Sequence, residues 1–192
     1  MKKSLVIFLS IAAVVAVLVI WMIGTYNKLV TLDEAVPAQW AQVESAYKRR
    51  ADLIPNLVAT VKGYADHEGG TFEAVTAARA KATQISVDPS DLSEEKFREF
   101  QAAQGELSAA LGRLMMIQES YPDLKANQNF LDLQAQLEGT ENRINTERMR
   151  YNEACRRLNS VIRRFPGMFF GFEKREYFEA SADDLETPEV QF

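Results

Sequence analysis

Side chains that could perform catalysis or bind a metal are few in this sequence of 192 residues. The only histidine, His67, stands between Asp66 and Glu68, and the only cysteine is Cys155. Consecutive residues on a helix point in different directions, whereas metal ligands must converge on one point. A hydrolytic triad is implausible around this histidine, and no glycine-rich phosphate loop follows a strand. We therefore expect no catalytic, cofactor-binding or metal-binding site.

Two charged residues stand in otherwise apolar patterns and are more informative. Arg50 and Glu147 each occupy a position where the spacing of apolar neighbours predicts burial. A charge between packed helices is costly unless it is paired, and such a pair commonly fixes the register. If the two helices are antiparallel with residue 30 level with residue 165, position 50 lies near 145. We therefore expect a structural ion pair between Arg50 and Glu147, with the neighbouring Arg49 reaching solvent.

The elements that must position these residues begin with an apolar segment. Leu5–Ile23 is nineteen residues long and carries no charge. As a helix it covers roughly 28 Å, which is enough to cross the hydrocarbon core of a bilayer. It is longer than the apolar part of a signal peptide, and Met22 stands where a cleavage site would need a small residue. We therefore predict an uncleaved transmembrane anchor at 5–24, preceded by a short N-terminus at 1–4.

The charges beside the anchor predict its orientation. Lys2 and Lys3 precede it, and Lys28 is the only basic residue close behind it. Basic residues favour the cytoplasmic side of a membrane. We therefore expect the N-terminus inside and the domain that follows the anchor outside the cytoplasm.

Beyond the anchor, apolar residues recur at alternating steps of three and four. The first such stripe comprises Val36, Trp40, Val43, Tyr47, Arg50, Ile54, Leu57, Val61 and Tyr64, and the last comprises Phe130, Leu133, Leu137, Thr140, Ile144, Glu147, Tyr151, Ala154, Leu158, Val161 and Phe165. Two shorter stripes occupy 72–85 and 97–117. This repeat is typical of helices that pack at shallow angles, as in coiled coils. We predict an all-α fold, an antiparallel up-and-down four-helix bundle with long helices over 25–166; only "EKREYFEA" has a strand-like character.

A proline interrupts the first of these patterns. Pro55 lies in "RRADLIPNLVATV" (49–61), where a helix would lose a backbone hydrogen bond at a cost of about 3 kcal/mol. In one interpretation Pro55 kinks a continuous helix that follows its partners around the bundle. In the other, the helix breaks and Asp52 caps a new one. Pro37 similarly lies either inside a helix that continues from the anchor or in the first turn of a new helix.

Long motifs in the chain resemble the LemA family. They are "YNKLV", "VPAQWAQVESAYKRRADLIPNLVATVKGYADHE", "AVTAARAKA" and "LEGTENRINTERMRYNEACRRLN", and the resemblance runs from Tyr26 through the final "VQF". It implies a bacterial protein of the cytoplasmic (inner) membrane with a single N-terminal span, an antiparallel four-helix bundle and no established enzymatic activity. The family pattern after the last helix is usually "FPSN" followed by a short apolar insert. Here "FPGMFFGFEKREYFEA" is shorter and lacks the asparagine.

The C-terminal tail, 167–192, is too rich in large apolar residues to be an ordinary polar tail. The residues concerned are Met168, Phe169, Phe170, Phe172, Tyr177 and Phe178. One possibility is that these rings pack back on the lower end of the bundle. The other is that they lie at the membrane surface, where aromatic rings are favoured, with Arg163, Arg164, Lys174 and Arg175 beside them to meet anionic headgroups. We predict the second arrangement, with Phe169, Phe170, Phe172, Tyr177 and Phe178 contacting the membrane and neighbouring protomers.

The composition limits the function further. The 22 basic and 27 acidic residues give a net charge of −5, whereas a nucleic-acid-binding protein would show a concentrated basic face. We predict a non-enzymatic, membrane-anchored helical scaffold or assembly protein that needs no cofactor. Its expected partners are the lipid bilayer, further copies of itself in a homo-oligomer, and other membrane proteins. The alternative is a sensor or ligand-binding module with a polar pocket in the bundle core, and a hydrolase is a third, weaker hypothesis.

Overall fold

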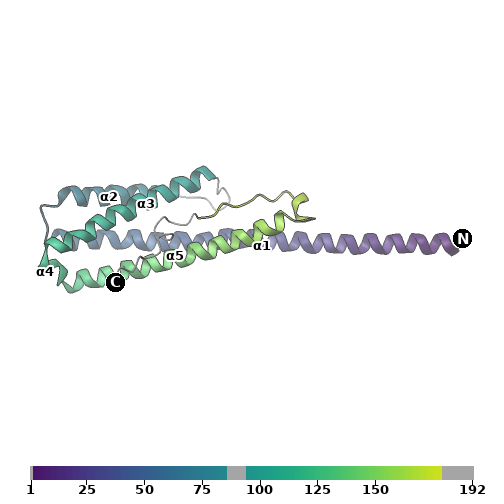
Figure 1. Ribbon diagram of the computed structural model, residues 1–192, viewed down its shortest axis with the longest axis horizontal. Coiled ribbons are helices and arrows are strands. Elements are labelled where there is room, and N and C mark those ends of the chain that lie inside the picture. The colour runs from purple at the N-terminus through teal and green to yellow at the C-terminus, as the bar shows by residue number, and fades with distance from the viewer. Residues whose placement is uncertain (1, 86–93, 179–192) are drawn as a thin grey trace, which may run out of the picture.

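A single helix runs from Lys2 to the far end of the bundle. The computed structural model describes residues 2–85 and 94–178, and its first helix, α1 (Lys2–Lys62), is 61 residues long. The anchor and the first bundle helix are therefore continuous, and Pro37 lies inside α1. The anchor part extends beyond the bundle with its apolar side chains exposed (Figure 1). It is long and apolar enough to cross a membrane.

Three more long helices complete an all-α fold, as the periodicity predicted. They are α2 (Gly69–Gln84), α3 (Glu94–Met116) and α5 (Gln128–Ile162), with the one-turn helix α4 (Pro122–Lys125) before α5. Short 3₁₀ turns follow α3 (η1, Ile117–Ser120) and α5 (η2, Gly167–Phe169). No strand occurs in the described parts of the chain, and 173–178, expected as a possible strand, forms no regular secondary structure there.

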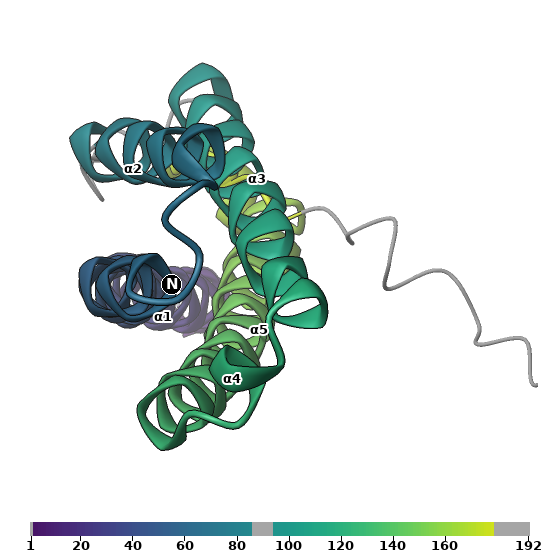
Figure 2. The ribbon, with the colours of Figure 1, turned by 90° about the vertical axis from the view of Figure 1, so that its left-hand side faces the viewer.

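The four long helices run alternately up and down. α1 packs along the antiparallel α5, and α2 packs along α3 (Figure 1). Seen from the end opposite the anchor, α2 and α3 lie together beside the α1–α5 pair (Figure 2). The start of α5 is fixed by Asn127, whose side-chain oxygen accepts a hydrogen bond from the Phe130 backbone N–H at 2.9 Å.

The core follows the predicted stripes closely. In α1 the stripe is buried from Val36 to Val61, whereas Tyr64, beyond the end of the helix, is exposed. In α5 the stripe is followed from Phe130 to Tyr151. Toward the end of the helix the prediction is wrong, because the buried positions there include Cys155 and Ile162, whereas Phe165, predicted to face inward, is 65% exposed. One core cluster lies in the half of the bundle next to the anchor, around Trp40, and the other fills the far half.

Candidate functional sites: the base of the bundle and its buried polar network

Exposed apolar side chains gather at the base of the bundle, where α1 leaves it toward the anchor. The ring centroids of Trp21 and Phe165 lie 5.6 Å apart, and those of Phe165 and Phe169 lie 5.8 Å apart. Phe165, Met168 and Phe169 remain 65%, 60% and 70% exposed. Large apolar groups rarely stay this exposed together unless they meet a partner or a membrane. The base cluster, which we define as Trp21, Phe165, Met168 and Phe169, is thus a candidate interaction surface.

Two other aromatic rings of the tail pack against α1 just above this cluster. Tyr26 lies 5.5 Å from Phe170 and 6.0 Å from Phe172, measured between ring centroids. Both phenylalanines are half-buried and contact the core cluster near the anchor. They therefore secure the tail to the bundle and leave only part of their surface for other contacts.

Phe178 does not belong to the membrane-facing group, so this part of the prediction is wrong. It is 4% exposed, and its ring centroid lies 4.7 Å from that of Phe97 and 5.4 Å from that of Tyr151. It also stacks on Trp40 at 5.9 Å. The extended tail runs back along the bundle and carries Phe178 into a ring-lined pocket, where burying its apolar surface is favourable.

Tyr177, the neighbouring ring, lies on α5 with 41% of its surface exposed. Its hydroxyl oxygen accepts a hydrogen bond from Asn159 Nδ2 at 2.9 Å.

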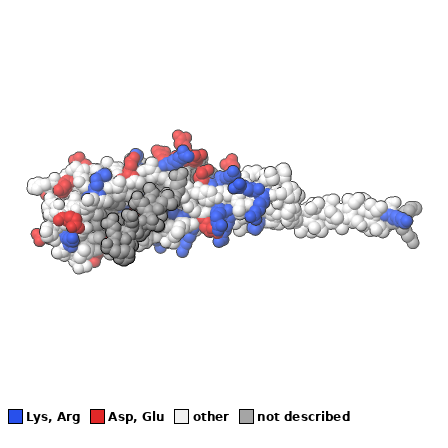
Figure 3. Space-filling view, in the orientation of Figure 1, with Lys and Arg blue, Asp and Glu red and all other residues white. Residues whose placement is uncertain are grey.

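The basic residues expected to meet lipid headgroups differ in whether they are paired or exposed. Arg175 donates to Asp33 at 3.1 Å, whereas Arg163 and Arg164 are exposed. On the face drawn in Figure 3, Lys and Arg side chains are densest in the part of the bundle next to the anchor.

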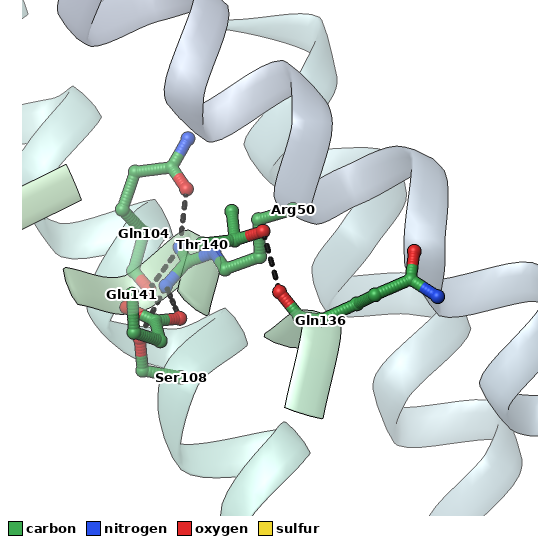
Figure 4. A network of polar contacts seen from close by, with 6 residues as sticks. All are labelled: Arg50, Gln104, Ser108, Gln136, Thr140 and Glu141. Atoms are coloured by element: carbon green, nitrogen blue, oxygen red, sulfur yellow. Dashed lines mark hydrogen bonds and ion pairs between the residues drawn. The ribbon is translucent and has the colours of Figure 1, made fainter. Parts of the chain in front are cut away.

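Arg50 is buried as predicted, and a network from two other helices holds it (Figure 4). Its guanidinium donates to Glu141 Oε1 and to Ser108 Oγ, both at 2.8 Å. It also donates to the side-chain and backbone oxygens of Gln104, at 2.6 and 3.3 Å. The cation further lies 5.1 Å from the centre of the Tyr47 ring. Burial raises the pKa of the Tyr47 hydroxyl. These contacts join α1, α3 and α5, which supports a structural role for the charge.

The predicted pairing of Arg50 with Glu147 is wrong, although both side chains are buried. Glu147 instead accepts hydrogen bonds from Gln39 at 2.8 Å and from Arg150 at 3.0 Å. Gln39 lies about three helical turns below Arg50, roughly 16 Å along α1. The helices are therefore shifted relative to the assumed register, and Glu141, a residue outside the apolar stripe, faces Arg50.

The helix continues through Pro55, so the break capped by Asp52 is wrong. Proline has no backbone N–H, which leaves the carbonyl four residues earlier, that of Ala51, without its helical partner. Arg79 of α2 supplies the missing donor, with its Nε 2.7 Å from that oxygen. Pro55 thus creates an acceptor on α1 that connects the helix to α2. Arg49, as expected, is exposed.

Sequence reasoning missed the residues that hold the tail. The side-chain amides of Asn152 and Asn159 bond the backbone of Phe178 and Arg175. Their spacing of seven residues places both on one face of α5. That spacing is the signal in the sequence that could have identified them.

Comparison with known proteins supports the resemblance found in the motifs. The model of the LemA family matches residues 39–192. The chain belongs to the LemA family. Magnetosome protein MamQ 2 of Paramagnetospirillum magneticum is 27% identical, over 95% of this chain and 74% of that protein. Magnetosome protein MamQ of Magnetospirillum gryphiswaldense is 26% identical, over 97% and 77%. Protein LemA of Metamycoplasma hominis is 26% identical, over 74% and 62%. The chain is accordingly a membrane-associated helical protein.

This LemA-family chain departs from the usual family pattern just after α5, and the structure gives a local reason for its glycine. Gly167 is buried against the end of α5, and a Cβ at this position would clash with the Val161 carbonyl oxygen. The close approach lets the chain turn back tightly beyond Phe165. The turn directs Met168 and Phe169 outward into the base cluster.

The sizeable clefts in the described parts of the LemA-family bundle include two. One, of about 540 Å³, lies between α1 and α5 and is lined by residues such as Gln39, Arg150 and Glu153. The other has a volume of about 640 Å³ and lies between α1 and the α2–α3 pair, lined by polar residues such as Glu44, Lys48 and Gln104 and by the rings of Tyr47 and Phe100. Within residues 2–85 and 94–178, no group of three His, Cys, Asp or Glu side chains is placed to hold a metal ion.

Proposed function

We propose that this LemA-family protein is a membrane-anchored scaffold that assembles with itself and with other membrane proteins, and that it is not an enzyme. The observation that carries the proposal is the base cluster, which joins the exposed side of the anchor to exposed rings of the tail. Aromatic rings are favoured at the membrane interface. Packing of these rings against lipid and against the base of a second copy would bury the exposed surface.

The uninterrupted α1 also supports a scaffold. Because one helix forms both the anchor and a wall of the bundle, no flexible linker separates the membrane from the domain. Copies anchored in one bilayer would therefore stand in a similar orientation, which favours symmetric self-association.

The proposed location is the bacterial cytoplasmic membrane, with the N-terminus inside and the bundle outside the cytoplasm. Lys2 and Lys3 on one side of the anchor outnumber Lys28 on the other. Arg163 and Arg164 come to lie near the anchor only when the bundle folds, so they do not enter the local charge bias that sets orientation. A reporter fused after Phe192 is expected to be active only outside the cytoplasm, and activity inside would reverse the orientation.

The test of the scaffold uses full-length protein extracted in a mild detergent. Two versions with different affinity tags are co-expressed, and we expect them to copurify as a discrete oligomer. Serine substitutions of Phe165, Met168 and Phe169 should reduce copurification while helical content by circular dichroism stays constant. The matched control replaces two exposed methionines remote from the base, Met116 and Met149. A protein that is monomeric throughout would refute the scaffold.

The cleft between α1 and the α2–α3 pair favours a second candidate function, that of a sensor. Its volume of about 640 Å³ is in the range of small-molecule sites, and its walls combine charged, amide and aromatic groups. A sensor would be monomeric or would change its oligomeric state with ligand. A bulky substitution in the wall of the cleft, such as Ala41→Trp, would then abolish the ligand-dependent change of oligomeric state. It would not weaken copurification of the two tagged versions in the absence of ligand.

A further inference from the structure

The tail lies on α5 as a bound peptide would, through contacts to its backbone. Asn152 Oδ1 accepts from the Phe178 N–H at 2.8 Å, while its Nδ2 donates to the Phe178 carbonyl at 3.0 Å. Asn159 makes the same pair of bonds with Arg175, at 3.0 and 2.8 Å. Each amide thus replaces the neighbouring strand that an extended chain would pair with in a sheet. We call these two residues the asparagine clamp.

The spacing of the clamp fits an extended chain. Seven residues of an α-helix rise about 10.5 Å, and three residues of an extended chain span about 10 Å. Asn152 and Asn159 therefore meet Phe178 and Arg175 without any adjustment of either partner. Apart from one hydrogen bond from Asn159 to the Tyr177 hydroxyl, the clamp contacts backbone atoms. It therefore fixes the register of a peptide and reads few of its side chains.

Selectivity comes from the pocket that receives Phe178. The rings of Trp40, Phe97 and Tyr151 surround it on three sides, and Arg148 lies over it at 4.9 Å. The groove on α5 is thus built for one kind of ligand, an extended peptide with an aromatic residue at its clamped end. In this structure the chain's own segment 172–178 occupies it.

The connection to that segment contains a candidate hinge. Gly171 has a φ of 73°, the one positive φ in the described residues, and a Cβ there would meet no atom within 4 Å. The folded-back path into the chain's own groove therefore depends on a backbone conformation that L-residues disfavour, and the hinge itself is not held by packing.

The anchor sets the height of the groove above the bilayer. Since α1 is continuous, Gly171 and the asparagine clamp lie at fixed heights above the bilayer in every copy. The segment of one copy can therefore enter the groove of a neighbour at the same register by lateral displacement alone. It would make the same contacts there as in its own groove, which is the condition for exchange of an element between protomers.

From these observations we propose that the groove is an exchange site, in which segment 172–178 of one copy occupies the groove of a second copy. The proposal rests on the proposed self-association and specifies how copies are joined. It adds an interaction distinct from the base cluster, located on α5 and made by backbone hydrogen bonds and one aromatic anchor.

Photo-crosslinking between two full-length copies in one membrane tests this proposal. The donor copy carries p-benzoylphenylalanine in place of Tyr177, whose hydroxyl contacts Asn159, and the acceptor copy carries a different tag. We expect a donor–acceptor product whose crosslink maps to α5 of the acceptor. Asn152→Asp with Asn159→Asp in the acceptor removes both amide donors and should lower the yield at least about fivefold. The control acceptor, Asn142→Asp, places the same charge at an exposed position of α5.

Gly171→Ala in the donor gives a test in the opposite direction. An L-residue disfavours the folded-back path, so the exchanged form should rise by about tenfold. An increase whose crosslink still maps to α5 of the acceptor at Asn159 is not expected from an unfolded donor tail, which would crosslink at no defined site. This protects the test if the aspartate variants fold poorly. A lower yield with Gly171→Ala would overturn the proposal.

The outcomes separate this proposal from the scaffold itself. If the two tags copurify but Tyr177 crosslinks only within its own chain, exchange is refuted and self-association stands. If the tags do not copurify and no donor–acceptor product forms, both proposals fail. A donor–acceptor product that is unaffected by the aspartate variants would place the contact elsewhere and also refute exchange.

Discussion

Replacing Arg79 with Met should destabilise the bundle by about 1–2 kcal/mol, because it leaves the Ala51 carbonyl without a donor. A buried acceptor left unsatisfied costs about 1–3 kcal/mol, and a hydrogen bond to a charged donor contributes about 1.5–3 kcal/mol. Ala51 is 3% exposed, so water reaches its backbone poorly. Arg79 is only half-buried, which places the expected loss in the lower part of these ranges.

Pro55→Ala should reduce the loss of stability that Arg79→Met causes. Alanine restores an N–H that can bond the Ala51 carbonyl within α1, so Arg79→Met should cost about 0.5 kcal/mol or less in that background. Pro55→Ala alone should be neutral or stabilising, since the helix already continues through this position. The expected coupling between positions 55 and 79 is therefore about 1 kcal/mol.

The assay is urea unfolding of the full-length protein in mild detergent, followed by fluorescence and circular dichroism. Arg98→Met is the matched control, because Arg98 is an exposed arginine on a neighbouring helix and should contribute little. Strict additivity of Pro55→Ala and Arg79→Met would show that the proline does not create the acceptor that Arg79 fills. A large loss of stability from Pro55→Ala alone would show that α1 requires the proline for its path.

Three further predictions concern the Arg50 network, Cys155 and Phe178. Glu141→Gln should cost about 1–2 kcal/mol and couple to Arg50→Met in a double-mutant cycle, whereas Glu147→Gln should show no coupling to Arg50→Met. Burial raises the pKa of the Cys155 thiol to about 11, so iodoacetamide at pH 8 should modify it, by mass spectrometry, only after unfolding. Because the pKa of this thiol is higher in the folded than in the unfolded protein, the protonated thiol stabilises the fold. The stabilisation is complete below the unfolded-state pKa of about 8.5 and should decrease as the pH rises toward 11. Phe178→Ala should cost about 3 kcal/mol in urea unfolding, since it empties a ring-lined pocket; a change below 0.5 kcal/mol would place this ring outside the core.

The helices could be predicted from the sequence because the signal for each is local. Alternating steps of three and four determine which face of a helix is buried, whatever the partner is. The same regularity explains why the partner of Arg50 was predicted wrongly. A stripe that repeats every seven residues packs almost equally well after a shift along the helix. Apolar spacing alone therefore does not establish whether Glu141 or Glu147 faces Arg50. Contacts made by residues outside the stripes, such as Gln39 to Glu147 and Glu141 to Arg50, determine the register.

The position of the tail was harder to predict, because its rings follow no period. Six large apolar residues within eleven positions fit either a membrane surface or a core. The structure divides them, with Phe169 exposed at the base and Phe178 buried against Trp40. What separates them is the backbone pairing of the segment with Asn152 and Asn159, and apolar patterns do not report backbone pairing.

In one case the sequence itself identifies a backbone group that will lack its helical partner. A proline inside a long amphipathic helix identifies the carbonyl four residues earlier as an acceptor that another element must satisfy or leave to water. At Pro55 that carbonyl belongs to Ala51, a buried position, so a donor from a neighbouring helix is required. A long basic side chain on the next helix is the natural candidate, and Arg79 is the only basic residue of α2 besides Lys81. The cost of the proline is thereby partly offset by a charged hydrogen bond between helices, which a regular helix at this position would not provide.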